Sequence, residues 1–390
     1  MKGMKTLRSG RNRRKWIYVL LLMGLLGLSG CGSPSSASVE MSSQTELVKT
    51  GSMELQYAEN FAVDYYEDGY KMLTTLPDSK RYLIVPEGQP VPRGLDEDVS
   101  ILQEPLQNIY LVASGVMDMF ASVDAVDQIR FSGQKQENWY IQTAKDAMAA
   151  GDMIYAGKYS KPDYELLVSE GCDLAIENRM ITHSPEVVEM LQSFDIPVMI
   201  EYSSYEQHPL GKVEWVKFFG ALTGKEAKAE EAFAEQTEIL EEVESGEKTG
   251  KTIAFFYVTS NGLIQVRQST DYIPKLIELA GGRYIFENLE DSGSGRSTLN
   301  MQVEDFYAGA KDADILIYNS SIDGGVTTVD ELIGKCNILK DFKAVQEGQV
   351  YCTTNDMYQQ SMAVGYLLQD MHTVLTDDDT AKLRYLFLLQ

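Results

Sequence analysis

Short apolar runs alternate with helical stretches along most of this chain. The runs that predict strands are 81–85, 108–113, 173–176, 197–201, 251–258, 314–318 and 349–353. The stretches with helical periodicity that lie among them are 163–169, 185–193, 272–280, 303–310 and 361–375. Apolar strands that alternate with helices are typical of sheets covered by helices. The pattern therefore predicts an α/β fold.

A long polar helix is predicted between the two halves of this pattern. The stretch 224–246 is dense in strong helix formers and has a glycine at each end. At 1.5 Å per residue such a helix reaches roughly 30 Å, the width of a small domain. A second predicted helix, 210–222, comes directly before it. We therefore expect two α/β lobes, 52–207 and 251–390, held at a restricted angle by a helical connection at 208–250.

The first thirty residues have the layout of a cleaved export signal. Seven basic residues, with no acid among them, precede an apolar run at 16–28. At about 13 residues this run is too short to span a bilayer comfortably. Residues 28–31, Leu-Ser-Gly-Cys, resemble the bacterial lipobox, in which the cysteine is lipidated and becomes the mature N-terminus. An uncleaved anchor with an incidental cysteine is the alternative, but the small residues around Cys31 favour a signal at 1–30 and lipidation.

The composition after Cys31 excludes some functions. Residues 31–51 are rich in serine without hydrophobic periodicity, which predicts a flexible tether. Cleavage removes seven positive charges and takes the formal net charge from −24 to −31. Nucleic-acid binding needs clustered Lys and Arg, so we exclude it. The three remaining cysteines, Cys172, Cys336 and Cys352, are odd in number and scattered, which predicts buried thiols rather than a disulfide framework.

Taken together, these features resemble the class III substrate-binding lipoproteins of ABC importers, which serve ferric siderophores, haem and cobalamin. The most specific match is 165–176, where Glu165 begins a helix and Asp173 opens an apolar strand eight residues later. Cys172 stands where the family usually has a proline. The stretches 277–282 and 342–351 are also similar. The resemblance covers about residues 57–375 and implies two Rossmann-like lobes, joined by a single long α-helix, with the ligand cleft between them.

The resemblance also implies a pair of docking residues. In this family one glutamate on each lobe docks onto arginine pockets of the permease. Glu165 fits the family spacing, whereas the strand after Glu304 opens two residues late, at Asp314. Each acid could instead merely complement the positive end of a helix dipole. We expect docking by Glu165 and, with a looser match, by Glu304.

The ligand site is predicted from topology, because ligands of open α/β sheets gather at the carboxyl ends of strands. Aromatic faces and arginines at such ends suit large ligands that carry carboxylate or catecholate oxygens. A structural ion pair is the alternative for either arginine, for example Arg179 with Glu177 or Glu201. The predicted ligand-binding residues are Arg179, Tyr202, Tyr257, Arg267, Tyr318 and Asn319.

No enzyme motif emerges from the sequence. The three histidines are far apart, and no nucleophile elbow or glycine-rich phosphate loop is present. His183 could ligate haem iron, but a polar loop histidine is the favoured interpretation. We therefore expect no catalytic residues, no resident cofactor and no dedicated metal site.

These observations predict the extracytoplasmic substrate-binding component of an ABC importer. It would capture a metal chelate, such as a ferric siderophore, haem or a cobalamin-like ligand, and deliver it to permease subunits driven by a cytoplasmic ATPase. We expect the protein to be a monomer that is held on the cell membrane by its N-terminal lipid alone. The alternative is a surface lipoprotein that binds a bare transition metal ion or acts as a ligand sensor; bare-ion sites need converging His, Asp and Glu.

Overall fold

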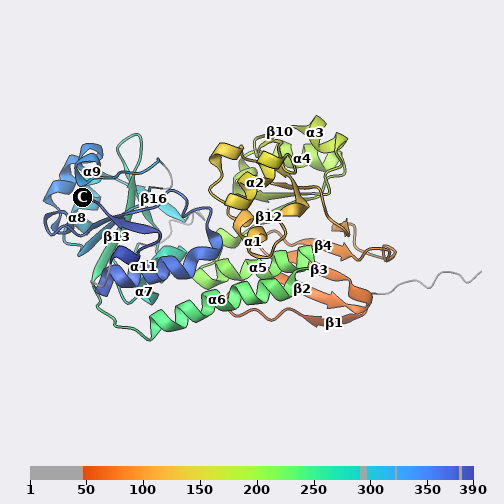
Figure 1. The fold of residues 1–390 in the computed structure, drawn as a ribbon, viewed down its shortest axis with the longest axis horizontal. Coiled ribbons are helices and arrows are strands. Elements are labelled where there is room, and N and C mark those ends of the chain that lie inside the picture. The colour runs from red at the N-terminus through yellow and green to blue at the C-terminus, as the bar shows by residue number, and fades with distance from the viewer. Residues whose placement is uncertain (1–46, 290–296, 321–322, 377–379) are drawn as a thin grey trace, which may run out of the picture. The chain divides into compact units, whose positions relative to one another are not determined.

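The computed structural model describes residues 47–289, 297–320, 323–376 and 380–390. The predicted signal, Cys31 and most of the predicted tether lie outside these described residues. The described residues, from 47 onward, belong to one compact unit (Figure 1). Within the described ranges, no helix combines the length and apolar character needed to cross a membrane.

A largely antiparallel sheet opens the fold, and the sequence analysis did not anticipate it. Neighbouring strands are antiparallel except for the last pair, which is parallel. The run 81–85 is a strand as predicted, but it pairs in this sheet and not in a Rossmann-like lobe. Residues 49–51, assigned above to the tether, belong to the first strand. The strands in spatial order are β1 (Lys49–Ser52), β2 (Phe61–Tyr66), β3 (Lys71–Thr75), β4 (Lys80–Val85) and β5 (Val99–Gln103).

The next sheet is parallel throughout, as the alternation of runs and helices predicts. Its spatial order is β12 (Val198–Glu201), β11 (Leu174–Asn178), β6 (Ile109–Leu111), β7 (Ile129–Ser132) and β8 (Ile154–Tyr155). Period-two alternation sends Leu174 and Ile176 to one apolar cluster and Ala175 to another. The helices that follow its strands are α1 (Val116–Ser122), α2 (Gln142–Ala150), α3 (Tyr164–Ser169) and α4 (Pro185–Ser193). A small hairpin pairs β9 (Gly157–Lys158) with β10 (Lys161–Pro162).

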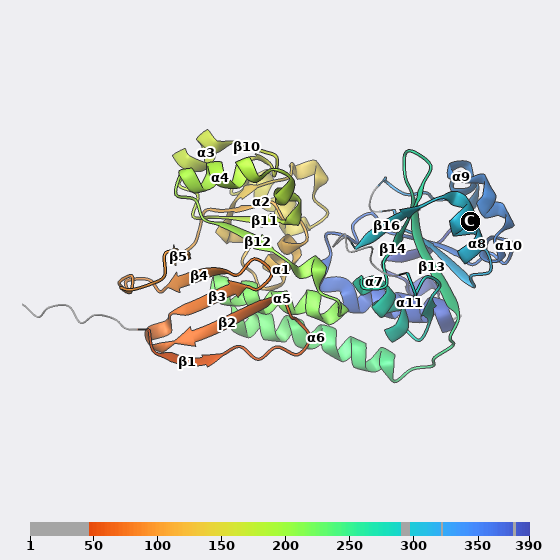
Figure 2. The same cartoon turned by 180° about the vertical axis from the view of Figure 1, so that it is seen from behind.

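The C-terminal sheet is mixed, with a parallel centre. Its path runs β16 (Thr298–Met301), β14 (Ile264–Arg267), β13 (Thr252–Val258), β17 (Ile315–Tyr318), β18 (Val350–Thr353) and β19 (Leu386–Leu388), and β15 (Arg283–Tyr284) also pairs with β13. Its helices, seen beside the sheet in Figure 2, are α7 (Tyr272–Leu279), α8 (Val303–Ala310), α9 (Val329–Lys335), α10 (Lys343–Gln346) and α11 (Val364–Thr376). Phe255 packs with α7 and α11, whereas its neighbour Phe256 packs with α8. The predicted α/β class is therefore confirmed.

Two helices carry the chain from the parallel sheet to the C-terminal sheet. They are α5 (Pro209–Thr223) and α6 (Glu226–Glu244), which confirm the two helices predicted here. Gly224, at φ 69°, ends α5 in the left-handed conformation that glycine adopts without strain. Every residue of α5 is buried, and both helices share one apolar cluster with α1, α7, α11 and a face of each of the three sheets. The core is therefore continuous through this helical layer.

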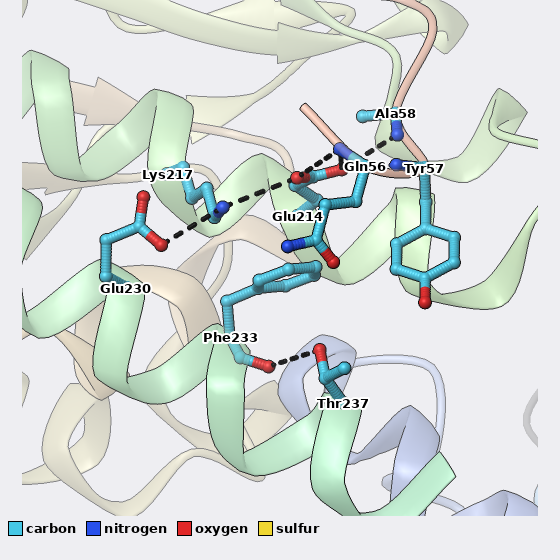
Figure 3. Close-up of polar contacts among 8 residues, drawn as sticks. All are labelled: Gln56, Tyr57, Ala58, Glu214, Lys217, Glu230, Phe233 and Thr237. Atoms are coloured by element: carbon cyan, nitrogen blue, oxygen red, sulfur yellow. Dashed lines mark hydrogen bonds and ion pairs between the residues drawn. The ribbon is translucent and has the colours of Figure 1, made fainter. Parts of the chain in front are cut away.

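Buried charges on α5 hold the first sheet to this layer (Figure 3). Glu214 accepts hydrogen bonds from the consecutive backbone N–H groups of Gln56, Tyr57 and Ala58, at 2.8–3.1 Å. The ammonium of Lys217 lies 3.4 Å from Glu214 and 3.0 Å from Glu230. Glu214 thus satisfies three backbone donors and one buried cation at once.

Short elements and thiols complete the described fold. Cys336 and Cys352 are buried, Cys172 is half-buried, and all three are free thiols, as predicted. The 3₁₀ turns are Glu67–Gly69, Val126–Gln128, Gln136–Asn138, Arg179–His183, Ser203–Tyr205, Asn337–Asp341, Ser361–Ala363 and Thr380–Lys382.

Candidate ligand-binding site

A cavity of about 420 Å³ opens at the carboxyl ends of β6, β11 and β12. Residues 113–115, most of 178–183 and most of 201–205 line it, together with Lys212 of α5 and with Tyr358 and Ser361 from the segment before α11. Strand ends in a parallel sheet meet at one edge, so this is where the topology rule places a ligand. The volume lies within the range of roughly 300–1,000 Å³ that is usual for small-molecule pockets.

Arg179 directly follows β11 and lines this cavity as a cation that has no acidic partner among the residues that the structure describes. Its guanidinium stacks on the ring of Tyr205, 4.2 Å from the ring centroid. The alternative ion pairs are not found in the described part of the chain. Glu177 is fully buried, neither of its carboxylate oxygens has a hydrogen-bond partner there, and burial raises its pKa well above the usual value.

Glu201 is turned toward its own strand end rather than toward Arg179. Its carboxylate accepts hydrogen bonds from the backbone N–H of Ser203 at 2.8 Å and from the Ser203 hydroxyl at 2.6 Å. Burial raises the pKa of Glu201, while these two bonds and the charge of Lys212 lower it. The carboxylate of Glu201 on the cavity wall is therefore already hydrogen-bonded to Ser203.

Lys212 is a functional candidate that the sequence analysis missed. The residue is 8% exposed and lines the cavity where it meets a narrow crevice. Its ammonium lies 4.7 Å from the ring centroid of Tyr272. Among the described residues, no carboxylate oxygen lies within 4.0 Å of this ammonium. The signal for it was the lysine's position in the otherwise apolar stretch 209–213, on a helix with no polar face.

The segment before α11 is fixed to the parallel lobe beside the cavity. The buried amide of Gln359 accepts from the backbone N–H of Tyr140 and donates to the carbonyl of Asn138, each at 2.8 Å. The rings of Tyr140 and Tyr358 meet edge to face, with centroids 6.3 Å apart. These contacts place the exposed Tyr358 ring on the cavity wall.

Asp118 holds the same segment from α1. Its carboxylate accepts the backbone N–H of Met362 at 2.7 Å. Burial raises the pKa of Asp118 to about 6, although the bond from Met362 and the charge of Lys212 lower it. At Gly115, a Cβ atom would lie 2.7 Å from the Ser361 hydroxyl, so the two segments approach closely here. Both lobes thus contribute to the site.

The structure does not bring the other predicted ligand residues to this cavity. Tyr202 is buried beside it, and Tyr318 is buried with its hydroxyl donating to Asp323 at 2.7 Å. Tyr257, Arg267 and Asn319 line a separate narrow crevice of the C-terminal sheet. Arg267 forms the structural ion pair given above as its alternative, 3.4 Å from the buried Asp271. A ligand role for these five residues stays a prediction.

The predicted docking residues lie at helix starts. Glu165 and Glu304 are exposed in the first turns of α3 and α8. The Asp163 side chain caps α3 by accepting the Leu166 N–H at 3.1 Å, which leaves Glu165 free of that task. His183 is exposed and lines the cavity. Nowhere in the described ranges do three His, Cys, Asp or Glu side chains converge as metal ligands.

A family model described as periplasmic binding protein matches residues 112–357. The chain belongs to this family. The match begins at the end of β6, so the sheet β1–β5 precedes it.

Solved structures show the same fold at low sequence identity. A possible iron-binding protein from Staphylococcus epidermidis has a TM-score of 0.54 at 16% identity and covers 69% of this chain and 98% of its own. The haem-binding protein HutB of Vibrio cholerae has a TM-score of 0.55 at 14% identity, over 68% and 98% of the two chains. An Fe³⁺-hydroxamate transport protein of Saccharomonospora viridis has a TM-score of 0.54 at 17% identity, over 69% and 93%. The predicted resemblance is therefore confirmed at the level of family and fold.

Longer relatives cover more of the chain. An uncharacterized lipoprotein of Methanocaldococcus jannaschii is 23% identical over 92% of this chain and 92% of its own. A second lipoprotein of the same organism is 23% identical over 89% and 90%. These alignments are long enough to extend beyond the family match into the first sheet or the N-terminal segment.

Proposed function

We propose that this protein is the lipid-anchored, extracytoplasmic substrate-binding component of an ABC importer that captures a metal chelate. The ligand would be a ferric siderophore, haem or a cobalamin-like compound, delivered to permease subunits that a cytoplasmic ATPase drives. The observation that carries the proposal is the cavity at the strand ends of a binding-protein fold. Arg179 and Lys212 line it without a carboxylate partner in the described part of the chain, and aromatic rings surround it. Solved relatives named for iron, haem and hydroxamate transport support it.

The ligand can be identified by isolating the full chain from its native membranes. Native mass spectrometry should detect a bound iron or cobalt chelate, and the absorbance spectrum should carry a visible band from the metal complex. An Arg179→Ala variant isolated in parallel should carry less of the same ligand. Protein that binds a bare ion, or no metal compound under metal limitation, would contradict the proposal.

Docking can be separated from ligand capture by variants of the two exposed glutamates. Glu165→Ala with Glu304→Ala should leave ligand affinity nearly unchanged and sharply reduce uptake, at a cost of about 1–3 kcal/mol for each unpaired arginine pocket. Glu186 and Asp330 are exposed acids in the first turns of α4 and α9, so replacing both with alanine is the matched control for a helix-dipole effect. Normal uptake by the Glu165/Glu304 double variant would remove the docking role.

Membrane attachment is tested at Cys31. A Cys31→Ala precursor should not incorporate a clickable fatty acid during metabolic labelling, and it should not be anchored normally. Labelling equal to that of the unsubstituted protein would show that the lipid is attached elsewhere or that the segment is not a lipobox.

A further inference from the structure

Two lysines of α5 are almost fully buried, but their surroundings differ. Lys217 is 4% exposed and lies within 3.4 Å of two carboxylates. Lys212 is 8% exposed and lines the cavity, and its ammonium lies 4.7 Å from the ring centroid of Tyr272. A buried ammonium without a hydrogen-bonded anion is costly and is seldom retained by a fold for stability alone.

The acidic groups whose charges act on Lys212 already have other partners. Asp118 accepts the N–H of Met362, and Glu201 accepts Ser203. Asp271 accepts the N–H of Ile273 at 2.9 Å and pairs with Arg267. Each of these carboxylates lies beyond 4.0 Å from the Lys212 ammonium. The lysine is therefore available to a group that enters the cavity.

We propose that Lys212 binds an anionic oxygen group of the ligand, with Arg179 as a second cation on the same cavity, and that the protein selects negatively charged chelates. The group would be a carboxylate, a phosphate or a catecholate oxygen. This inference rests on the proposed function and assigns the ligand class and the residue that selects it. Among the described residues, Lys212 then has no carboxylate within 4.0 Å in the empty protein, and it gains an anionic partner in the complex.

Calorimetric titration of the full chain in detergent tests the selection with ferric chelates of different charge. The anionic probes are ferric citrate and ferric tris-catecholate, the neutral probe is ferrichrome, and the cationic probe is ferrioxamine B. The protein should prefer the anionic probes, with an affinity that falls from about 50 to about 500 mM salt. Lys212→Met keeps the aliphatic stem and should weaken anionic probes by about ten- to a hundredfold, without changing the affinity for ferrichrome.

A stability measurement separates this role from a structural one. Without ligand, Lys212→Met should not lower the midpoint of thermal unfolding, because the desolvation cost of a buried ammonium disappears together with its attraction to Asp118, Glu201 and Asp271. A lysine kept only for its contact with Tyr272 would give a lower midpoint. Lys217→Met is the matched control on the same helix and should lower the midpoint; if it does not fold, the exposed Lys275→Met serves as the charge control for the titrations.

The outcomes distinguish this inference from the proposed function. If the unsubstituted protein binds none of the chelates, the proposed function fails and the inference fails with it. If it binds chelates regardless of charge, or if Lys212→Met binds the anionic probes as tightly as before, the proposed function stands and the anion selection is wrong.

Discussion

The two buried lysines of α5 differ in their partners: Lys217 is paired with carboxylates, whereas Lys212 faces a cavity. Lys217 forms ion pairs with Glu214 and Glu230, and Glu214 also accepts hydrogen bonds from three backbone N–H groups. Around Lys212, the carboxylates are engaged elsewhere and a cavity takes their place. A buried charged side chain therefore indicates a ligand site only where no oppositely charged side chain is paired with it.

The two predicted ligand arginines repeat this contrast in different lobes. Arg267 pairs with the buried Asp271 and lies 5.6 Å from the Phe255 ring centroid. Arg179 stacks on the Tyr205 ring at the cavity. Both follow or end strands and look alike in sequence, yet Arg267 pairs with a buried acid whereas Arg179 lines the cavity.

Removing Glu214, the buried partner of Lys217, should destabilise the protein most. Glu214→Leu should lower the free energy of unfolding by about 3–5 kcal/mol, because it leaves Lys217 with the exposed Glu230 alone and leaves backbone N–H groups unsatisfied. Urea denaturation at neutral pH measures this. Glu230→Ala is the control and should cost less than about 1 kcal/mol. If Glu214→Leu lowered the free energy of unfolding only slightly, ion pairing would not be what distinguishes Lys217 from Lys212.

Arg267→Met should have the next largest effect. It leaves Asp271 buried without its cation, which should cost about 2–3 kcal/mol in the same measurement. Arg283→Met removes an exposed arginine paired with Glu287 and should cost less than about 0.5 kcal/mol. Equal losses for the two variants would contradict the assignment of Arg267 to the core.

Asp118, close to Lys212, should make the stability of the protein depend on pH. Its pKa rises on folding from 3.8 to about 6, so between these values the folded protein holds a proton that the unfolded chain has released. The free energy of unfolding should therefore fall by about 3 kcal/mol as pH rises through this window, and the loss should be complete above it. Asp118→Asn keeps an oxygen acceptor for Met362 and should remove this fall.

The measurement for Asp118 is urea denaturation of both proteins across the window. The variant should gain about 3 kcal/mol over the unsubstituted protein at neutral pH and nothing below the window. Lys212→Met should shift the fall to higher pH, because the positive charge of Lys212 lowers the pKa of Asp118. Parallel pH profiles for the asparagine variant and the parent would contradict the shift.

The smallest expected effect on stability is at Arg179. Its guanidinium has no carboxylate partner among the described residues, so Arg179→Ala should change the free energy of unfolding by less than about 0.5 kcal/mol. Thermal unfolding without ligand measures this, and titration with ferric tris-catecholate should show weaker binding. A loss above about 1 kcal/mol would assign Arg179 a structural role.

Sequence pattern was sufficient where local periodicity decides the structure. The helices at 185–193 and 303–310 lie at their predicted residues, and the strand at 314–318 is within one residue of its prediction. The membership of a strand in a sheet depends on pairing between distant residues, which periodicity does not report. That is why 81–85 was assigned to the wrong sheet and the rest of β1–β5 was not anticipated.

The same limit applies to the site. The strand-end rule placed Arg179 correctly beside the cavity, because strand ends follow from the strands themselves. It could not separate Arg179 from Arg267, since the partner of Arg267 was not weighed. Lys212 is on a helix, outside the reach of the rule, and only the buried surroundings of α5 identify it.

The continuous core through α5, α6 and α11 sets the order in which this protein can mature. The N–H of Gly365 donates to the side chain of Gln236, 129 positions earlier, and α11 covers α6 along this layer. A ribosome completes α6 long before α11, so the layer cannot close until nearly the whole chain has been synthesised. Passage through a secretion channel, as the export proposed above requires, needs an unfolded chain, and such late closure meets that requirement.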